Sequence, residues 1–156
     1  MAATRSKTDE FILFMLGNTN YGIRSSMVQQ MEMVEQITPV PNAPPFVEGI
    51  VFLRGQVIPV INLRQKFGFD KIPYDLTSRM VVVKHAERVV GFTVDTAREF
   101  VSIDPGTIQP PPDDISSASR RYLEGICSFQ DRLVLLLNIG EVINLPEINL
   151  TVPEGA

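Results

Sequence analysis

Short apolar segments alternate with polar turns along almost the whole chain. Each segment is rich in Val, Ile, Leu or Phe and is bounded by Gly, Pro, Asn or Asp, which is typical of β-strands separated by turns. Two segments, 57–61 and 133–137, are continuously apolar, as expected for strands that are covered on both faces. The pattern predicts strands at 11–16, 31–37, 50–53, 57–62, 80–84, 89–94, 100–103, 125–129 and 133–138.

The gaps between these segments carry turn-forming residues. The turn signals fall at 17–20, 54–55, 86–88 and 130–131. Helical periodicity never lasts longer than about two turns, and the best short helices lie at 25–29, 63–67 and 139–143. The sequence therefore predicts a mainly β protein with a few short helices.

An internal repeat is the most informative feature of the pattern. Residues 46–50 read Phe-Val-Glu-Gly-Ile and residues 122–126 read Tyr-Leu-Glu-Gly-Ile, and the match continues from 57–63 to 133–139 at a constant offset of 76. A weaker match, at an offset of 69, relates the segments 11–14 and 21–23 to 80–83 and 90–92. A register held this long indicates a duplicated unit of short strands.

Duplication predicts two small β-barrel subdomains within one domain that spans 9–145. We place them at about 9–70 and 79–145, allow the ends of the chain to cross between them, and expect flexible tails at 1–8 and 146–156. A half of about 70 residues buries little core by itself. Two barrels side by side are therefore expected to share an apolar seam and to leave a groove, which is the usual place for a partner.

Composition and charge narrow the class of protein. The 156 residues are 44% hydrophobic and 21% charged, as in a soluble globular domain. The balance of 14 basic and 18 acidic residues gives a net charge of −4, which argues against charge-driven binding to nucleic acid or anionic membrane. Aliphatic runs of about five residues are far short of the roughly 20 that cross a bilayer. No signal peptide is visible, so we expect a cytoplasmic protein.

Groups that could act in catalysis or bind a metal are few. The single Cys127 excludes an internal disulfide and any multi-cysteine metal site, and the single His85 lies where a strand meets a turn. We expect His85 to be solvated and Cys127 to be a small buried hydrophobe. No phosphate loop, dinucleotide fingerprint or zinc spacing occurs. We therefore expect no enzyme activity, no metal and no cofactor.

Four glycines are predicted to serve structural turns: Gly49, Gly55, Gly91 and Gly125. Gly49 and Gly125 hold equivalent repeat positions and are expected to mark tight bends or close backbone packing. Gly55 would supply the positive φ of the hairpin turn that it forms with Arg54. The long Arg54 side chain could pair with a nearby carboxylate or contact a partner, and the two roles are compatible.

Methionines gather in one short segment, at Met27, Met31 and Met33. They could be adaptable core residues, or they could form a surface that accepts varied apolar partners. A short helix at 25–29 that runs into a strand would place Met27 and Val28 on different sides.

The stretch 46–64 resembles the CheW-like domain family of chemotaxis coupling proteins. The family motif runs from a glycine and a short aliphatic strand through L-R-G and I-P-V to L-R, and it stands here as Leu53-Arg54-Gly55, Ile58-Pro59-Val60 and Leu63-Arg64. Further matches lie at 89–95, 122–125 and 132–138, so the resemblance covers about 9–145. Phe52 departs from the family pattern, which has Asn before L-R-G.

The resemblance implies a non-catalytic adaptor made of two SH3-like five-stranded barrels. Such adaptors couple the cytoplasmic tips of chemoreceptors to the regulatory domain of the CheA histidine kinase, in arrays at the membrane. The implied receptor-binding groove comprises Val28, Gln30, Met31 and Arg54. The implied kinase-binding residues are Thr38, Val57 and Ile58. Gln30 replaces the Glu that often pairs with the motif arginine, so that ion pair cannot form here.

Two alternatives stay open. The resemblance does not separate flagellar chemotaxis from a related pilus or gliding pathway. A generic small barrel that binds nucleic acid or a small ligand is the alternative from another class. A barrel for single-stranded nucleic acid would interleave basic residues with exposed aromatics, whereas this chain has no Trp, three Tyr and an acidic second half.

Overall fold

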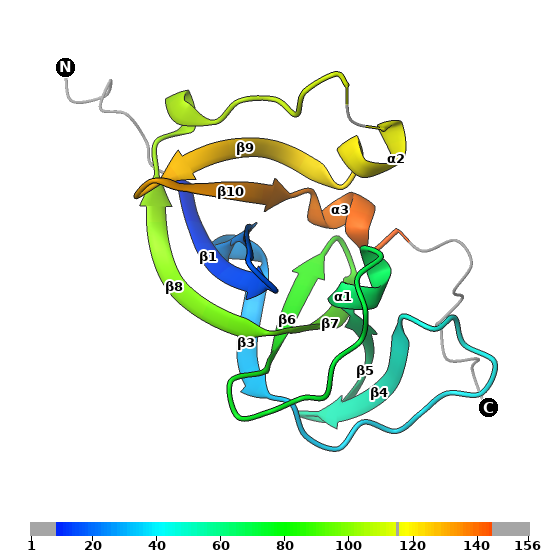
Figure 1. Cartoon of the computed structure of the whole chain (residues 1–156). Coiled ribbons are helices and arrows are strands. Elements are labelled where there is room, and N and C mark those ends of the chain that lie inside the picture. Colours follow the sequence, from blue (N-terminus) through cyan, green and yellow to red (C-terminus); the bar gives the residue numbers. More distant parts are fainter. Residues whose placement is uncertain (1–8, 115, 145–156) are drawn as a thin grey trace.

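The structure is a computed structural model that describes residues 9–114 and 116–144, and its main elements are two five-stranded β-sheets (Figure 1). Sheet A has the order β8 (Thr96–Ile103), β1 (Asp9–Leu16), β2 (Thr19–Arg24), β10 (Arg132–Leu137) and β9 (Leu123–Phe129). Sheet B has the order β3 (Val28–Met33), β6 (Arg79–His85), β7 (Arg88–Val94), β5 (Gln56–Asn62) and β4 (Val47–Leu53). The predicted mainly β fold with two five-stranded units is confirmed. The expected tails, 1–8 and 146–156, lie outside the described residues.

The helices are short, and two of them begin at equivalent asparagines. They are α1 (Leu63–Lys66), α2 (Ser117–Arg120), α3 (Ile139–Val142) and the 3₁₀ turns η2 (Ser25–Met27) and η3 (Pro105–Thr107). The Asn62 and Asn138 side chains accept hydrogen bonds from the backbone N–H groups of Gln65 and Glu141. These caps satisfy N–H groups that the first helical turn leaves unpaired. The helices predicted at 63–67 and 139–143 are thereby confirmed, whereas α2 was not predicted.

Two strands differ most from the sequence prediction, and β4 and β8 also begin three and four residues before the predicted 50–53 and 100–103. β2 was not predicted as a strand, although the weaker repeat match had marked its residues 21–23. β3 lies at Val28–Met33 rather than at 31–37. Its partner strand β6 begins at Arg79, opposite Met33, so residues 34–37 extend past the end of β6. Val34 and Ile37 instead pack from a loop against a core cluster of sheet B.

The two sheets repeat one topology. Each has an antiparallel hairpin at its centre, β1–β2 or β6–β7, and a second hairpin, β9–β10 or β4–β5. The hairpins join through a short parallel pair, β2 with β10 in sheet A and β7 with β5 in sheet B. The remaining edge strand is β8 or β3. The predicted duplication is therefore visible as two sheets with equivalent strand orders.

The sheets nevertheless divide the chain differently from the expected halves, 9–70 and 79–145. Sheet A contains the hairpin of the first half, β1–β2, and three strands of the second half. Sheet B contains the hairpin of the second half, β6–β7, and three strands of the first half. Each sequence copy thus gives its first hairpin to the sheet that holds the rest of the other copy.

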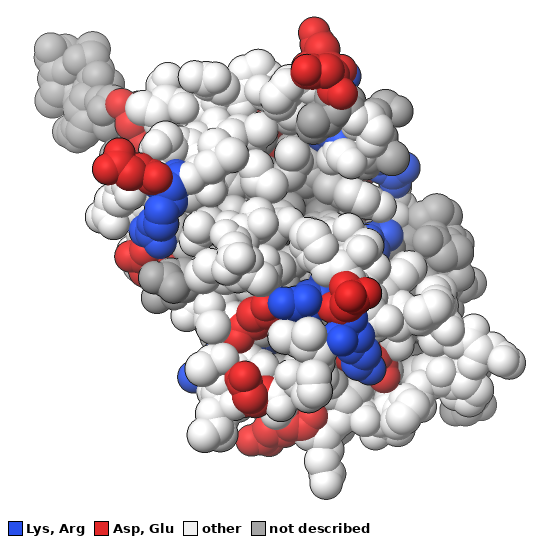
Figure 2. Space-filling view, viewed as in Figure 1, with Lys and Arg blue, Asp and Glu red and all other residues white. Residues whose placement is uncertain are grey.

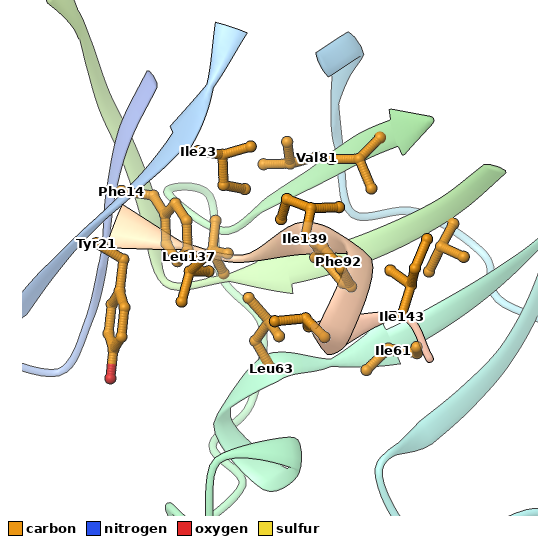
Figure 3. Packing of buried hydrophobic residues seen from close by; sticks show 14 of the residues in the cluster. Phe14, Tyr21, Ile23, Ile61, Leu63, Val81, Phe92, Leu137, Ile139 and Ile143 are labelled. Carbon is orange, nitrogen blue, oxygen red and sulfur yellow. The ribbon is translucent and has the colours of Figure 1, made fainter. Parts of the chain in front are cut away.

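One core cluster joins the two sheets. It contains Phe14 and Ile23 of sheet A, Val81 and Phe92 of sheet B, and residues of α3 such as Ile139, all fully or almost fully buried (Figure 3). Smaller clusters lie within each sheet. Burial of this many large aliphatic and aromatic side chains is the main stabilising contribution to the fold. The predicted shared apolar seam corresponds to the joint cluster.

Candidate functional site

Three of the four residues expected at a receptor groove, Val28, Gln30 and Met31, lie on β3 and occupy both of its faces. Gln30 is opposite Val82, which belongs to a core cluster of sheet B, and its side-chain amide donates a hydrogen bond of 2.8 Å to Glu32. Met31 is opposite Val81, which belongs to the cluster between the sheets. Because opposite residues of an antiparallel pair share a face, Gln30 and Met31 point to different sides. Val28, which packs on the joint cluster, shares the side of Met31.

A surface hollow opens beside Met31, between β3 of sheet B and β1 and β8 of sheet A. We call it the β3–β8 hollow, and the residues that line it are Ile12, Ser25, Met31, Ala97, Glu99 and Phe100. Met31 is 41% exposed and Phe100 is 64% exposed. Large apolar side chains at this exposure in a concave site are typical of a protein contact.

Phe100 was not singled out from the sequence, although a signal was present. Along β8, Val101 and Ile103 are buried, while Phe100 and Ser102 are exposed. The alternation therefore puts a phenylalanine on the polar face of its strand. An apolar residue in register with polar ones is the pattern that could have marked it.

Arg54 lies at the turn between β4 and β5. In sheet B, β4 is one edge strand and β3 is the other. Its side chain is exposed and makes no hydrogen bond or ion pair with any residue in the described part of the chain. Its φ of 51° and the φ of 76° at Gly55 give the left-handed pair of a type I′ hairpin turn. The predicted turn is confirmed, and no contact in it joins Arg54 to Gln30.

The residues expected to face a kinase fall on two faces of the β4–β5 hairpin. Phe52 and Val57 are opposite each other and are 70% and 42% exposed. Thr38 is exposed beside them, where its backbone N–H and C=O pair with Ile50. Ile58 is 3% exposed and packs inside sheet B, so it supports the hairpin from within and offers no surface. Phe52, Val57 and Thr38 form what we call the hairpin face.

The four glycines that were expected to serve turns differ in what their positions require. Gly55 is a turn residue, but Gly49, Gly91 and Gly125 lie within strands, so the expectation of four turn glycines is wrong. A Cβ on Gly49, whose φ is 144°, would lie 2.0 Å from the Thr38 carbonyl oxygen. A Cβ on Gly125 would lie 2.4 Å from Ile108. Gly49 and Gly125 thus allow close packing, as their shared repeat position suggested.

A network of polar side chains holds the segment after α1 against sheet B. The Glu48 carboxylate accepts hydrogen bonds from Asn62 at 2.9 Å, from Lys71 at 3.0 Å and from the Tyr74 hydroxyl. Burial raises the pKa of Glu48, but these donors together outweigh burial, so the pKa lies below its ordinary value of 4.5. Tyr74 could not be identified from sequence patterns, because its partners are distant along the chain.

A second ion pair closes the same end of the molecule. Arg64 contacts Asp95 at 2.8 Å, and Asp95 also accepts a hydrogen bond of 2.7 Å from the backbone N–H of Gly17. Burial raises the pKa of Asp95, but the hydrogen bonds from Arg64 and from the Gly17 N–H lower it by more. The pKa of Asp95 therefore lies below its ordinary value. The pair links α1, sheet A and sheet B, which is a structural role.

The two candidate chemical residues are both packed. Cys127 is buried in the core of sheet A, as expected. His85 is half-buried, and its ring lies so close to Gly140 of α3 that a Cβ there would be 2.9 Å away, so the expectation of a solvated His85 is wrong. Within residues 9–114 and 116–144, no group of three His, Cys, Asp or Glu side chains is placed to hold a metal ion.

The surface charge is dispersed on the face shown in Figure 2. Acidic and basic side chains lie there in small separate groups within a large uncharged area. A continuous basic stripe, which a nucleic-acid groove would need, is not part of this face. Among the described helices, none has the length and apolar character to cross a membrane.

Comparison with known families decides the relationship of this fold. The model of the CheW-like domain matches residues 10–147, which is most of the chain. This protein belongs to the CheW-like domain family. The resemblance at the L-R-G and I-P-V motifs is thereby confirmed over the same span of sequence.

Individual CheW relatives agree with this membership. The chain is 33% identical over 141 residues to a chemotaxis protein CheW of Klebsiella aerogenes, covering 90% of this chain and 85% of that protein. It is 35% identical over 136 residues to a chemotaxis protein CheW of Helicobacter pylori, covering 86% and 81%. The crystal structure of the scaffolding protein TtCheW from Thermoanaerobacter tengcongensis matches with a TM-score of 0.85 at 28% identity, covering 94% of this chain and all of that one.

Proposed function

We propose that this protein is a non-catalytic scaffold of chemotaxis signalling that couples chemoreceptors to the regulatory domain of a CheA histidine kinase. The observation that carries the proposal is the match of the CheW-like domain over residues 10–147. The TM-score of 0.85 to a protein described as a scaffolding protein supports the same role. The function then depends on binding surfaces and requires no cofactor.

The β3–β8 hollow is the surface that we propose for the receptor tip. Met31 and Phe100 offer apolar contact from the two sheets, and Val28 supports β3 from the joint core cluster. A helical hairpin that places apolar side chains in such a hollow would bury both residues at once. Gln30 points to the other side of β3, so it would affect this surface only by changing the position of the strand.

The hairpin face is the surface that we propose for the kinase. Phe52 and Val57 form an exposed apolar pair, which is the kind of site where binding energy concentrates. Thr38 and Arg54 flank this pair at the strand edge and at the turn. A phenylalanine at position 52, where the family has asparagine, adds apolar area to this surface.

The proposed location is the cytoplasm, with recruitment to membrane receptor arrays through protein contacts. The hollow and the hairpin face comprise different residues, so receptor and kinase could bind at the same time. This is what a coupling scaffold requires.

Binding measurements with purified partners from the same organism test the proposal. We expect M31S with F100S to weaken binding of a receptor cytoplasmic fragment about tenfold or more, and F52S with V57S to weaken binding of the CheA regulatory domain to a similar extent. The matched control is I72S, which removes a half-exposed aliphatic side chain outside both surfaces. Circular dichroism checks that every variant remains folded.

The pattern of losses distinguishes the assignments. If each double variant loses one partner and keeps the other, both surfaces are supported. Equal loss of both partners, or no loss, would contradict the assignment. Binding of oligonucleotides with no binding of either protein partner would favour the generic barrel module instead.

A further inference from the structure

An aromatic pocket lies between sheet A and the segment that follows β5 of sheet B. Tyr21, Lys66, Phe67, Phe69, Tyr122 and Leu135 line it, with two further leucines and a serine. The rings of Tyr21, Phe67 and Tyr122 follow one another at centroid distances of 5.6 and 5.8 Å. None of these residues belongs to the β3–β8 hollow or to the hairpin face.

The pocket contains a cation that forms no ion pair with any described residue. The Lys66 ammonium lies 4.6 Å from the centroid of the Phe46 ring and 5.2 Å from that of Tyr122. It makes no salt bridge within the described residues, and no acidic residue lines the pocket. A cation held against aromatic rings and partly withdrawn from water attracts an anion more strongly than a solvated one does.

The pocket also contains a hydrogen-bond donor that has no acceptor in the described part of the chain. Tyr21 is 5% exposed, and its hydroxyl makes no hydrogen bond within the described residues. Figure 3 shows this hydroxyl pointing away from the core residues around it. The hydroxyl oxygen itself is reached by solvent at the pocket wall, so it is available to donate to an acceptor bound there.

The internal repeat supplies a control for this site. At the offsets of 69 and 76, Tyr21 corresponds to Val90, Lys66 to Val142 and Phe67 to Ile143. These three counterparts are aliphatic and at most 2% exposed, within the core cluster between the sheets. The position that is closed by aliphatic packing in one copy is therefore an open pocket with a phenol and an ammonium group in the other.

We propose that the aromatic pocket binds a small organic carboxylate that carries a flat apolar body. The carboxylate would accept from the Lys66 ammonium and the Tyr21 hydroxyl, while the body lies against Phe67, Tyr122 and Leu135. Because Tyr21 and Leu135 belong to sheet A and Lys66 follows β5 of sheet B, the ligand would bridge the two sheets. Binding should therefore stabilise the folded protein.

Three probes of similar size test the charge preference of the pocket. We expect phenylacetate to bind with a Kd in the low millimolar range or tighter, because this affinity is typical of a ligand with about ten non-hydrogen atoms. Neutral phenylacetamide should bind about fivefold more weakly, and phenethylammonium more weakly still. Titration calorimetry gives the affinities, and amide chemical shifts should move around Tyr21, Phe67, Tyr122 and Leu135.

Two pocket variants and one control locate the binding. K66M keeps the apolar stem and should remove the preference for phenylacetate over phenylacetamide, and Y21F should reduce it about twofold to threefold. K84M, which changes an exposed lysine on β6, should leave it unchanged. The proposal is overturned if no binding is detected at a phenylacetate concentration 10-fold above the expected Kd, or if phenylacetate binds no better than phenylacetamide. It is also overturned if folded K66M still prefers phenylacetate over phenylacetamide.

Discussion

Two glutamates at equivalent repeat positions, Glu48 and Glu124, have different partners. Glu124 forms an ion pair with Arg24 at 2.7 Å, across strands of sheet A. Glu48 instead receives three side-chain donors, two of which, Lys71 and Tyr74, come from the segment after α1. The same residue type in the same repeat position thus stabilises a strand edge in one copy and anchors a loop in the other.

The Glu48 network predicts a dependence of stability on pH. The folded pKa of Glu48 is lowered, so its contribution to stability is present above the unfolded pKa and is lost as pH falls through the folded value. We expect the free energy of unfolding to decrease below about pH 4.5, with E48Q showing a smaller decrease than wild type. Urea denaturation between pH 7 and pH 3 measures both. An identical acid slope in E48Q would show that other carboxylates, such as Asp95, carry the effect.

Gly49 predicts a large steric effect. In G49A, the new Cβ would meet the Thr38 backbone, which pairs with Ile50 through hydrogen bonds of 2.9 and 2.8 Å. We expect a loss of about 2–4 kcal/mol in the free energy of unfolding, because backbone atoms must move. G55A is the matched control: its φ is also positive, but no atom of a described residue lies within 4 Å of the new Cβ, so a loss of about 1–2 kcal/mol is expected. Equal losses in urea denaturation would mean that φ alone decides the cost.

At the scale of elements, short connections force the exchange of hairpins between the two copies. Suppose β3 paired antiparallel with β1, as it does with the equivalent strand β6. It would then run parallel to β2, and its start would lie a full strand of about 20 Å from the end of β2. The connection between them, η2, can span at most about 14 Å. β3 therefore has to join the other sheet.

The helix caps give a prediction at the same scale. The side chain of Asn138 caps α3, whereas that of Asn62 caps α1 and also donates to Glu48. We expect N138A to cost about 1 kcal/mol in the free energy of unfolding, as for a lost cap. N62A should cost about 1–3 kcal/mol more, because the Glu48 carboxylate loses a donor in a partly buried site. Denaturation of both variants at pH 7 measures the difference, and a larger loss in N138A would contradict this account.

For the whole molecule, the exchange makes both sequence copies necessary for either sheet. We expect fragments 1–78 and 79–156 to be unfolded separately and to form a folded one-to-one complex when mixed. The reason is that each fragment holds a hairpin and three strands that belong to different sheets. Amide NMR spectra and sedimentation of the separate and mixed fragments test this. Well-dispersed spectra from either fragment alone would contradict it.

The sequence by itself determined the local elements and their duplication. The turns at 54–55 and 130–131, the helices after Asn62 and Asn138, and the repeat at an offset of 76 depend on residues close in the chain. Turn conformation and helix capping are local preferences, which sequence patterns record. The resemblance to the family motifs also predicted the fold class, a mainly β protein with two five-stranded units.

Only the tertiary structure decided which sheet each strand joins and which side chains remain exposed. The continuous apolar run 57–61 has no two-residue alternation, so it could not show that Ile58 is buried while Val57 is exposed. Glu48 with Tyr74, and Tyr21 with Lys66, come together across 26 and 45 positions of sequence. Such contacts depend on how the two sheets pack, and the physical reason they escape sequence analysis is that burial and pairing are properties of the assembled core.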